Sequence, residues 1–102
     1  MDRVLSFISI AAKAGKIASG EFATEKAIKD GKAYLVIAAG DASDNTKKHF
    51  EDMCRYRKIR FCVYGTKESL GKACGKDYRS NIAVCDKGFS DNIDRLLAEV
   101  EI

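Results

Sequence analysis

Hydrophobic and polar positions along this chain follow two periods in turn. Apolar residues spaced three or four apart predict amphipathic helices, and short apolar runs predict strands, among which the continuous run 35–39 is expected to be covered on both faces. The pattern predicts helices at 2–14, 20–31, 45–57, 66–75 and from 90 onward, and strands at 17–19, 35–39, 60–64 and 82–85. This alternation predicts the α/β class, as a three-layer α/β/α sandwich in which five helices cover a four-stranded mixed sheet.

Several predicted boundaries carry residues that commonly start or end a helix. Thr66 and Ser90 have hydroxyl side chains suited to an N-cap, and Gly31 and Gly75 follow the last apolar positions of their helices. The chain has 102 residues and no proline. Since this length suits one hydrophobic core, we expect a single domain over residues 1–102.

Charge is unevenly distributed along the chain. The total of 18 basic and 15 acidic residues gives a formal net charge of +3. Residues 91–102 carry four carboxylates against Arg95, a net charge of −3, so residues 1–90 carry +6. A basic body suits a polyanionic partner such as nucleic acid, and the alternative is an ordinary solvated surface rich in lysine.

The cysteines and the N-terminal residues indicate in which cellular compartment the protein is expected. The four cysteines form no C-x-x-C pair and lie among apolar neighbours, which predicts reduced, mostly buried thiols rather than disulfides or a metal site. The apolar stretch 4–14 has helical spacing and contains Ser6, Ser9 and Lys13, which favours a first helix over a signal peptide. No stretch is long enough to span a membrane, so we expect a cytoplasmic protein without a membrane partner.

Known catalytic motifs are absent from the sequence. Gly15-Lys16 and Gly75-Lys76 lack the preceding glycine and the following serine or threonine of a phosphate-binding loop. His49, the only histidine, lies in a polar stretch and is predicted to face solvent. The sequence therefore predicts a protein that is not an enzyme and needs no cofactor or metal.

Binding surfaces are better supported than catalytic ones. The predicted helix that Gly20 opens presents free backbone N–H groups, which commonly bind phosphate or another anion. Lys26 and Lys29 follow on that helix and Lys16 precedes it. Glu21 either complements the helix dipole or accepts hydrogen bonds from the edge of an exposed guanine.

Two further segments are candidates for contact with nucleic acid. In the segment 75–81, Tyr78 can stack on an unpaired base and Arg79 can hold a phosphate. In the turn 41–48, Asn45, Thr46, Lys47 and Lys48 can reach a nucleic-acid backbone. The alternative for both segments is an ordinary solvated loop. All three candidate segments lie next to predicted strand ends, where α/β proteins gather their ligand contacts.

A set of short motifs over about residues 4 to 97 resembles the kink-turn RNA-binding ribosomal protein family (L-seven-Ae), and its small bacterial members in particular. The motifs are Ala14-Gly15-Lys16, Ser19-Gly20-Glu21, Lys26-Ala27-Ile28, Gly31-Lys32-Ala33, Asp41-Ala42-Ser43, Asn45-Thr46-Lys47-Lys48, Gly65-Thr66, Leu70-Gly71-Lys72-Ala73, Gly75-Lys76 and Asp86-Lys87-Gly88-Phe89. Each motif alone is weak, and their combination is specific.

The resemblance implies an RNA-binding protein that acts as a monomer on structured RNA, either ribosomal RNA or a kink-turn, with ribosomal proteins as further partners. A kink-turn is a sharply bent helix with a three-nucleotide bulge beside sheared G·A pairs. The family places the start of its second helix in the RNA groove and a loop before its last strand over the bulge. The residues that this implies for RNA contact are Lys16, Gly20, Glu21, Phe22, Lys26, Lys29, Ser43, Asn45, Lys47, Lys76, Tyr78, Arg79 and Ile82.

The sequence departs from the family at one important place. Archaeal and eukaryotic members carry Asn-Glu in the second helix, and that pair addresses the guanines of the G·A pairs. Phe22 and Ala23 stand there in this chain, although Gly20 and Lys26 match. Phe22 either packs into the core or stacks on a base. This departure motivates an alternative function, a protein-interaction module of a ribosome or transcription complex that does not contact RNA.

Overall fold

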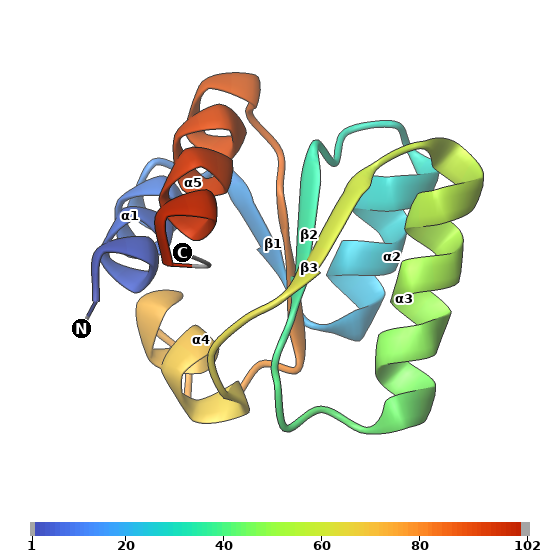
Figure 1. The fold of residues 1–102 in the computed structure, drawn as a ribbon, viewed down its shortest axis with the longest axis horizontal. Coiled ribbons are helices and arrows are strands. Elements are labelled where there is room, and N and C mark those ends of the chain that lie inside the picture. Colours follow the sequence, from blue (N-terminus) through green and yellow to red (C-terminus); the bar gives the residue numbers. More distant parts are fainter. Residues whose placement is uncertain (1, 101–102) are drawn as a thin grey trace.

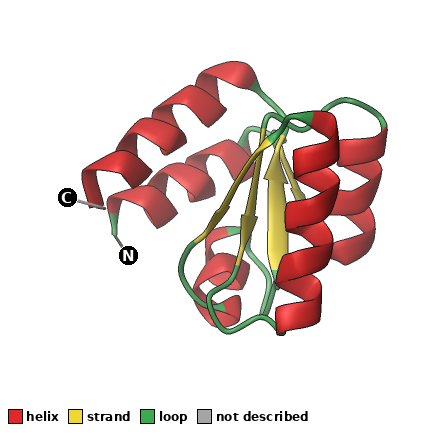
Figure 2. Ribbon diagram, turned by 45° about the vertical axis from the view of Figure 1, so that its right-hand side comes forward, coloured by secondary structure: helices red, strands yellow, loops and turns green. Residues whose placement is uncertain are grey.

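The computed structural model describes residues 2–100, in which five helices alternate with four strands (Figure 1). In chain order they are α1 (Arg3–Lys13), β1 (Ile17–Ser19), α2 (Glu21–Lys29), β2 (Leu35–Ala38), α3 (Asp44–Arg57), β3 (Arg60–Val63), α4 (Lys67–Ala73), β4 (Asn81–Val84) and α5 (Lys87–Val100). Helices α1, α4 and α5 cover one face of the sheet, and α2 and α3 cover the other (Figures 1 and 2). The predicted α/β/α sandwich is confirmed.

The sheet topology brings distant loops to one end of the molecule. The strand order is β1-β4-β2-β3. β4 is antiparallel to both β1 and β2, and β2 is parallel to β3. Consequently β1, β2 and β3 finish, and β4 starts, at the same end of the sheet. We call this the lower end, following its position in Figure 1.

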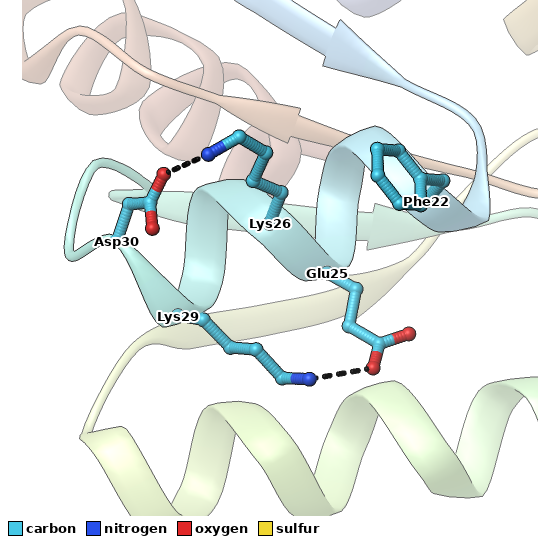
Figure 3. A pocket seen from close by; sticks show the side chains of 5 residues that line it. All are labelled: Phe22, Glu25, Lys26, Lys29 and Asp30. Carbon is cyan, nitrogen blue, oxygen red and sulfur yellow. Dashed lines mark hydrogen bonds and ion pairs between the residues drawn. The ribbon is translucent and has the colours of Figure 1, made fainter.

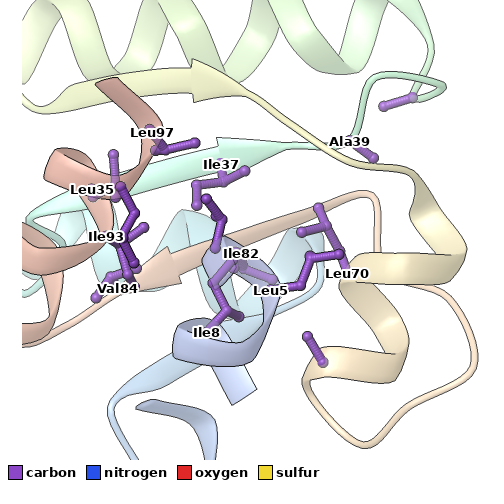
Figure 4. Packing of buried hydrophobic residues seen from close by; sticks show 14 residues of the cluster. Leu5, Ile8, Leu35, Ile37, Ala39, Leu70, Ile82, Val84, Ile93 and Leu97 are labelled. Atoms are coloured by element: carbon purple, nitrogen blue, oxygen red, sulfur yellow. The ribbon is translucent and has the colours of Figure 1, made fainter. Parts of the chain in front are cut away.

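The core is divided between the two faces of the sheet because strand side chains alternate. Leu35 and Ile37 of β2 pack with α1, α4 and α5 (Figure 4). Val36, between them, packs with Ile28 of α2 and Phe50 of α3 on the other face. β2 and β4 are buried throughout, which explains why both were recognisable as continuous apolar runs.

The start of α5 was predicted wrongly. The helix begins at Lys87, where the Oδ1 atom of Asp86 accepts a hydrogen bond from the backbone N–H of Phe89 at 3.0 Å. Ser90, the predicted cap, is a buried residue inside the helix. The error arose because exposed Lys87 and Gly88 separate the true cap from the first apolar position of the helix.

Other boundaries differ by one or two residues. The predicted cap at Thr66 is confirmed, since its hydroxyl accepts a hydrogen bond from the N–H of Ser69 at 3.0 Å. β4 starts at Asn81, one residue earlier than predicted. All four cysteines are free thiols, of which Cys54 is buried and the other three are half-buried. Within residues 2–100 no helix combines the length and apolar character that crossing a bilayer requires.

Asp2 ties the start of α1 to the end of β3. One carboxylate oxygen accepts the N–H of Leu5 at 2.8 Å, and the other accepts the phenol of Tyr64 at 2.6 Å. Burial, and then the hydrogen bond and charge of Asp2, raise the pKa of Tyr64 to about 12. The phenol is therefore held in its protonated form in the folded protein.

We expect Tyr64→Phe to change how stability depends on pH. Because the folded pKa lies above the unfolded value of about 10, the stability from the phenol is complete below pH 10 and is lost as the pH rises toward 12. Chemical unfolding of both proteins should give a stability difference that is constant below pH 10 and then shrinks. A difference that stays constant up to pH 12 would contradict this assignment.

Candidate nucleic-acid interface

Three segments meet at the lower end of the sheet. The N–H of Gly20 donates to the carbonyl of Asn81 at 3.0 Å, which joins the start of α2 to the start of β4. The Oγ1 atom of Thr46 donates to the Glu21 carboxylate at 3.4 Å, which joins α3 to α2. The start of α2, the start of α3 and the loop before β4 therefore form one continuous surface, as their predicted positions at strand ends require.

Arg79 lies at the centre of this surface. Its Nε atom donates to the hydroxyl of Ser19 at 3.2 Å, and its Nη1 atom donates to the carbonyl of Tyr78 at 2.7 Å. A Cβ atom added to Gly20 would lie 3.7 Å from the Nε of Arg79, so the guanidinium rests directly on the start of α2. Among the described residues Arg79 has no carboxylate partner, and its positive charge is uncompensated.

The start of α2 has the geometry of an anion site. Gly20 has a φ of 96°, which favours glycine, and it provides no side-chain cap. The starts of α1, α3 and α4 are capped by Asp2, Ser43 and Thr66. Uncapped N–H groups at the positive end of a helix dipole bind phosphate or carboxylate groups well.

Two exposed aromatic rings lie on the segments that meet at Arg79. Phe22, in the first turn of α2, is 83% exposed, and Tyr78 is 62% exposed. Of the two alternatives for Phe22, packing into the core is excluded. Ala23 is half-buried and has no polar side chain, so neither residue can read a base edge by hydrogen bonding.

The lysines of α2 are held in exposed ion pairs. Lys26 lies 2.7 Å from Asp30 and Lys29 lies 3.1 Å from Glu25 (Figure 3). Hydrogen bonding and charge from these lysines lower the carboxyl pKa values of Asp30 and Glu25. Such exposed pairs contribute little to stability and exchange partners easily. Along the helix, Lys26 lies about 9 Å and Lys29 about 13 Å from Gly20. Lys26 is therefore better placed than Lys29 to contact an anion at the start of α2.

The start of α3 is another of the three segments that meet at this surface. The hydroxyl of Ser43 accepts the N–H of Thr46 at 3.1 Å and donates to the Thr46 hydroxyl at 2.9 Å. Ser43 therefore caps the helix and positions Thr46. Asn45 is exposed and Lys47 is half-buried, and within the described chain Lys47 has no carboxylate partner.

Three predicted contact residues are not placed at the centre of this surface. Ile82 is completely buried in the core, so its prediction as a direct RNA contact is wrong. Lys16 precedes β1 and its carbonyl accepts the N–H of Cys85 at 2.8 Å, which places it at the opposite end of the sheet. Lys29 lies at the far end of α2.

The loop before β4 is positioned by close packing on α4. The backbone N–H of Lys76 donates to the carbonyl of Gly71 at 2.8 Å, and Lys76 itself is exposed. A Cβ atom at Gly71 would lie 2.6 Å from the carbonyl oxygen of Asp77 and 2.7 Å from the N of Tyr78. Only glycine allows the loop to come this close to the helix.

Sequence reasoning missed the roles of Ser19 and Gly71 in organising this surface, whereas Thr46 lies in the turn that was predicted to reach a nucleic-acid backbone. Only Gly71 carried a signal, since a glycine inside a predicted helix lowers its stability and needs a reason. Among residues 2–100 there is no group of three or more side chains able to hold a metal ion. His49 is exposed, as predicted, with its Nε2 atom 3.6 Å from Glu25.

Comparison with known proteins places this chain in a family. Residues 2–94 match the Ribosomal protein L7Ae/L30e/S12e/Gadd45 family. The chain is 37% identical over 90 residues to the RNA-binding protein YlxQ of Bacillus subtilis, covering 88% of this chain and 90% of that protein. It is 30% identical over 95 residues to the RNA-binding protein YlxQ of Enterococcus faecium, with coverages of 93% and 91%.

Solved structures agree with this relationship. A protein of unknown function from Bacillus halodurans superposes with a TM-score of 0.92 at 37% identity, covering 96% of this chain and 99% of that chain. The 15.5kD RNA binding protein of Giardia lamblia superposes with a TM-score of 0.78 at 25% identity, with coverages of 95% and 83%. The chain therefore belongs to the ribosomal protein L7Ae/L30e/S12e/Gadd45 family.

Proposed function

We propose that this protein binds structured RNA, without catalysis, through the lower end of its sheet. The observation that carries the proposal is the uncompensated guanidinium of Arg79 resting on the uncapped start of α2. Together they offer backbone N–H donors and a positive charge to the same phosphate groups. The names of relatives from Bacillus subtilis and Giardia lamblia, both RNA-binding proteins, support this proposal.

We further propose that the preferred RNA is sharply bent, as in a kink-turn. Ribosomal RNA is one example of an RNA that contains such a bend. A bent RNA presents its phosphate backbone and unpaired bases close together. This surface has hydrogen-bond donors that can bind the phosphates and exposed aromatic rings that can stack on the bases. In this arrangement Gly20 and Lys26 face phosphate, Glu21 accepts from base N–H groups, and Tyr78 with Arg79 covers the unpaired nucleotides.

Titration of the protein against a kink-turn RNA and a straight duplex of equal length tests this function. Over a series of salt concentrations we expect tighter binding to the bent RNA at every concentration. Equal, weak binding to both, with the same salt dependence, would reduce the interaction to nonspecific electrostatics and would reject the proposal.

Lys26→Ala should weaken kink-turn binding and lower the slope of log affinity against log salt concentration by about one, because one phosphate contact is lost. Lys87→Ala is the matched control, since Lys87 forms a similar exposed pair with Asp91 at 3.1 Å on α5, across the sheet. The control slope should equal that of the wild type. If Lys26→Ala leaves the slope unchanged, Lys26 does not contact phosphate in the complex.

A further inference from the structure

The exposed ring of Phe22 borders a groove beside α2. Single exposed apolar residues are common, and Tyr56 on α3 is as exposed as Phe22. Phe22 differs because it adjoins the proposed RNA surface and lines two hollows that share Lys26 and Asp30. In Figure 3 Phe22 and Lys26 project from the same side of α2, whereas Glu25 and Lys29 point toward α3.

The groove has an apolar floor and a cationic rim. It is lined by Ala18, Phe22, Ala23, Lys26, Ala27, Asp30, Lys32 and Cys85. Small side chains from β1 and α2 form the floor together with the half-buried thiol of Cys85, whose pKa is raised by burial. The single carboxylate of the groove, Asp30, is paired with Lys26 at 2.7 Å, and the positive charges of Lys26 and Lys32 lower its pKa.

The open shape of the groove favours part of a longer chain over a free small molecule. The groove has a volume of about 280 Å³ and is widely open to solvent, whereas small-molecule pockets enclose most of their ligand. An aromatic ring beside lysines is the arrangement that binds unpaired nucleotides, with the base stacked on the ring and the phosphate near a cation. The groove also begins at Phe22, two residues from Gly20, so it continues the proposed RNA surface.

We propose that this groove is a subsite for one unpaired nucleotide of the bound RNA, with its base stacked on the exposed ring of Phe22 beside the apolar floor. The inference rests on the proposed RNA-binding function. Because Phe22 and Ala23 have no side-chain hydrogen-bonding groups, stacking on Phe22 would supply the selectivity for RNA at this position. Since every base has a stacking face, the subsite requires an unpaired base but tolerates its identity.

A double-mutant cycle between protein and RNA tests the subsite. Each of the three bulged nucleotides of a kink-turn RNA is replaced in turn by an abasic nucleotide. The affinities of wild type, Phe22→Ala and Tyr56→Ala are then measured. We expect Phe22→Ala to weaken binding about 5- to 150-fold. One abasic position should weaken the wild type by a similar factor and should have no further effect on Phe22→Ala. The matched exposed aromatic, Tyr56→Ala, should bind as the wild type does.

The outcomes separate the subsite from the function on which it rests. If the wild type prefers the kink-turn and Phe22→Ala binds equally well, the subsite is rejected and the RNA-binding function stands. The subsite is also rejected if Phe22→Ala weakens binding but no abasic position is coupled to it. If the wild type does not distinguish the kink-turn from a duplex, the function itself fails. Equal thermal unfolding of the variants confirms that exposed Phe22 is not needed for folding.

Discussion

Gly71→Ala should destabilise the protein by about 1–3 kcal/mol, because a Cβ atom there overlaps packed backbone. In an ordinary helix the same change is stabilising, by up to about 1 kcal/mol, since alanine favours the helical conformation. At Gly71 the added methyl group would lie 2.6 Å from the carbonyl oxygen of Asp77 and 2.7 Å from its carbonyl carbon. These are backbone atoms and cannot rotate away, so the steric cost exceeds the gain in propensity.

The same substitution should weaken RNA binding, because the displaced loop carries Tyr78 and Arg79. Chemical unfolding and RNA titration at a temperature where the variant is folded measure the two effects separately. Gly88→Ala is the control, since Gly88 is also helical and its Cβ would meet only a side-chain oxygen, Oδ1 of Asp86, at 3.3 Å. A Gly71→Ala protein as stable as Gly88→Ala, with unchanged affinity, would contradict the packing of this loop on α4.

Asn81→Leu should raise the free energy of unfolding by about 1–3 kcal/mol, the usual cost of a buried polar group without a partner. Asn81 is completely buried, and within residues 2–100 neither its side-chain N nor its side-chain O has a hydrogen-bond partner. Leucine has a similar shape and no polar atoms. RNA affinity should be unchanged, since the contact of Asn81 with Gly20 uses the backbone carbonyl.

Urea unfolding of three variants checks this expectation. Asn92→Leu is the control, because the Asn92 side chain donates to the carbonyl of Gly88 and accepts from Arg95. That variant should not gain stability. Asn81→Asp should lose stability, since it buries a carboxyl group at the same position. A loss of stability in Asn81→Leu would show that the amide makes a hydrogen bond that stabilises the fold.

Most of the fold was predictable because its elements differ in period. β2 and β4 are buried on both faces and gave unbroken apolar runs, while the helices showed apolar residues three or four positions apart. Boundaries were predicted where a cap and the apolar pattern coincide, as at Thr66. They were missed where the two separate, as at Asp86 and Ser90.

The site was predictable as three segments but not as individual contacts. Strand ends fixed which loops meet, whereas the direction of each side chain depends on register and packing. Ile82 was assigned to the RNA surface, yet as the second residue of β4 it points into the core. The contact between Arg79 and Ser19 joins residues 60 positions apart and leaves no trace in local sequence. The exposure of Phe22 was likewise undecided until the packing of α2 was known.

Amide chemical shifts of the labelled protein during titration with kink-turn RNA test the central claim most directly. We expect the largest changes at Gly20, Phe22, Thr46 and Arg79, which lie on one continuous surface, and no significant changes along α5 on the far side of the sheet. Changes confined to α1 and α5, or none at saturating RNA, would contradict RNA binding at the lower end of the sheet.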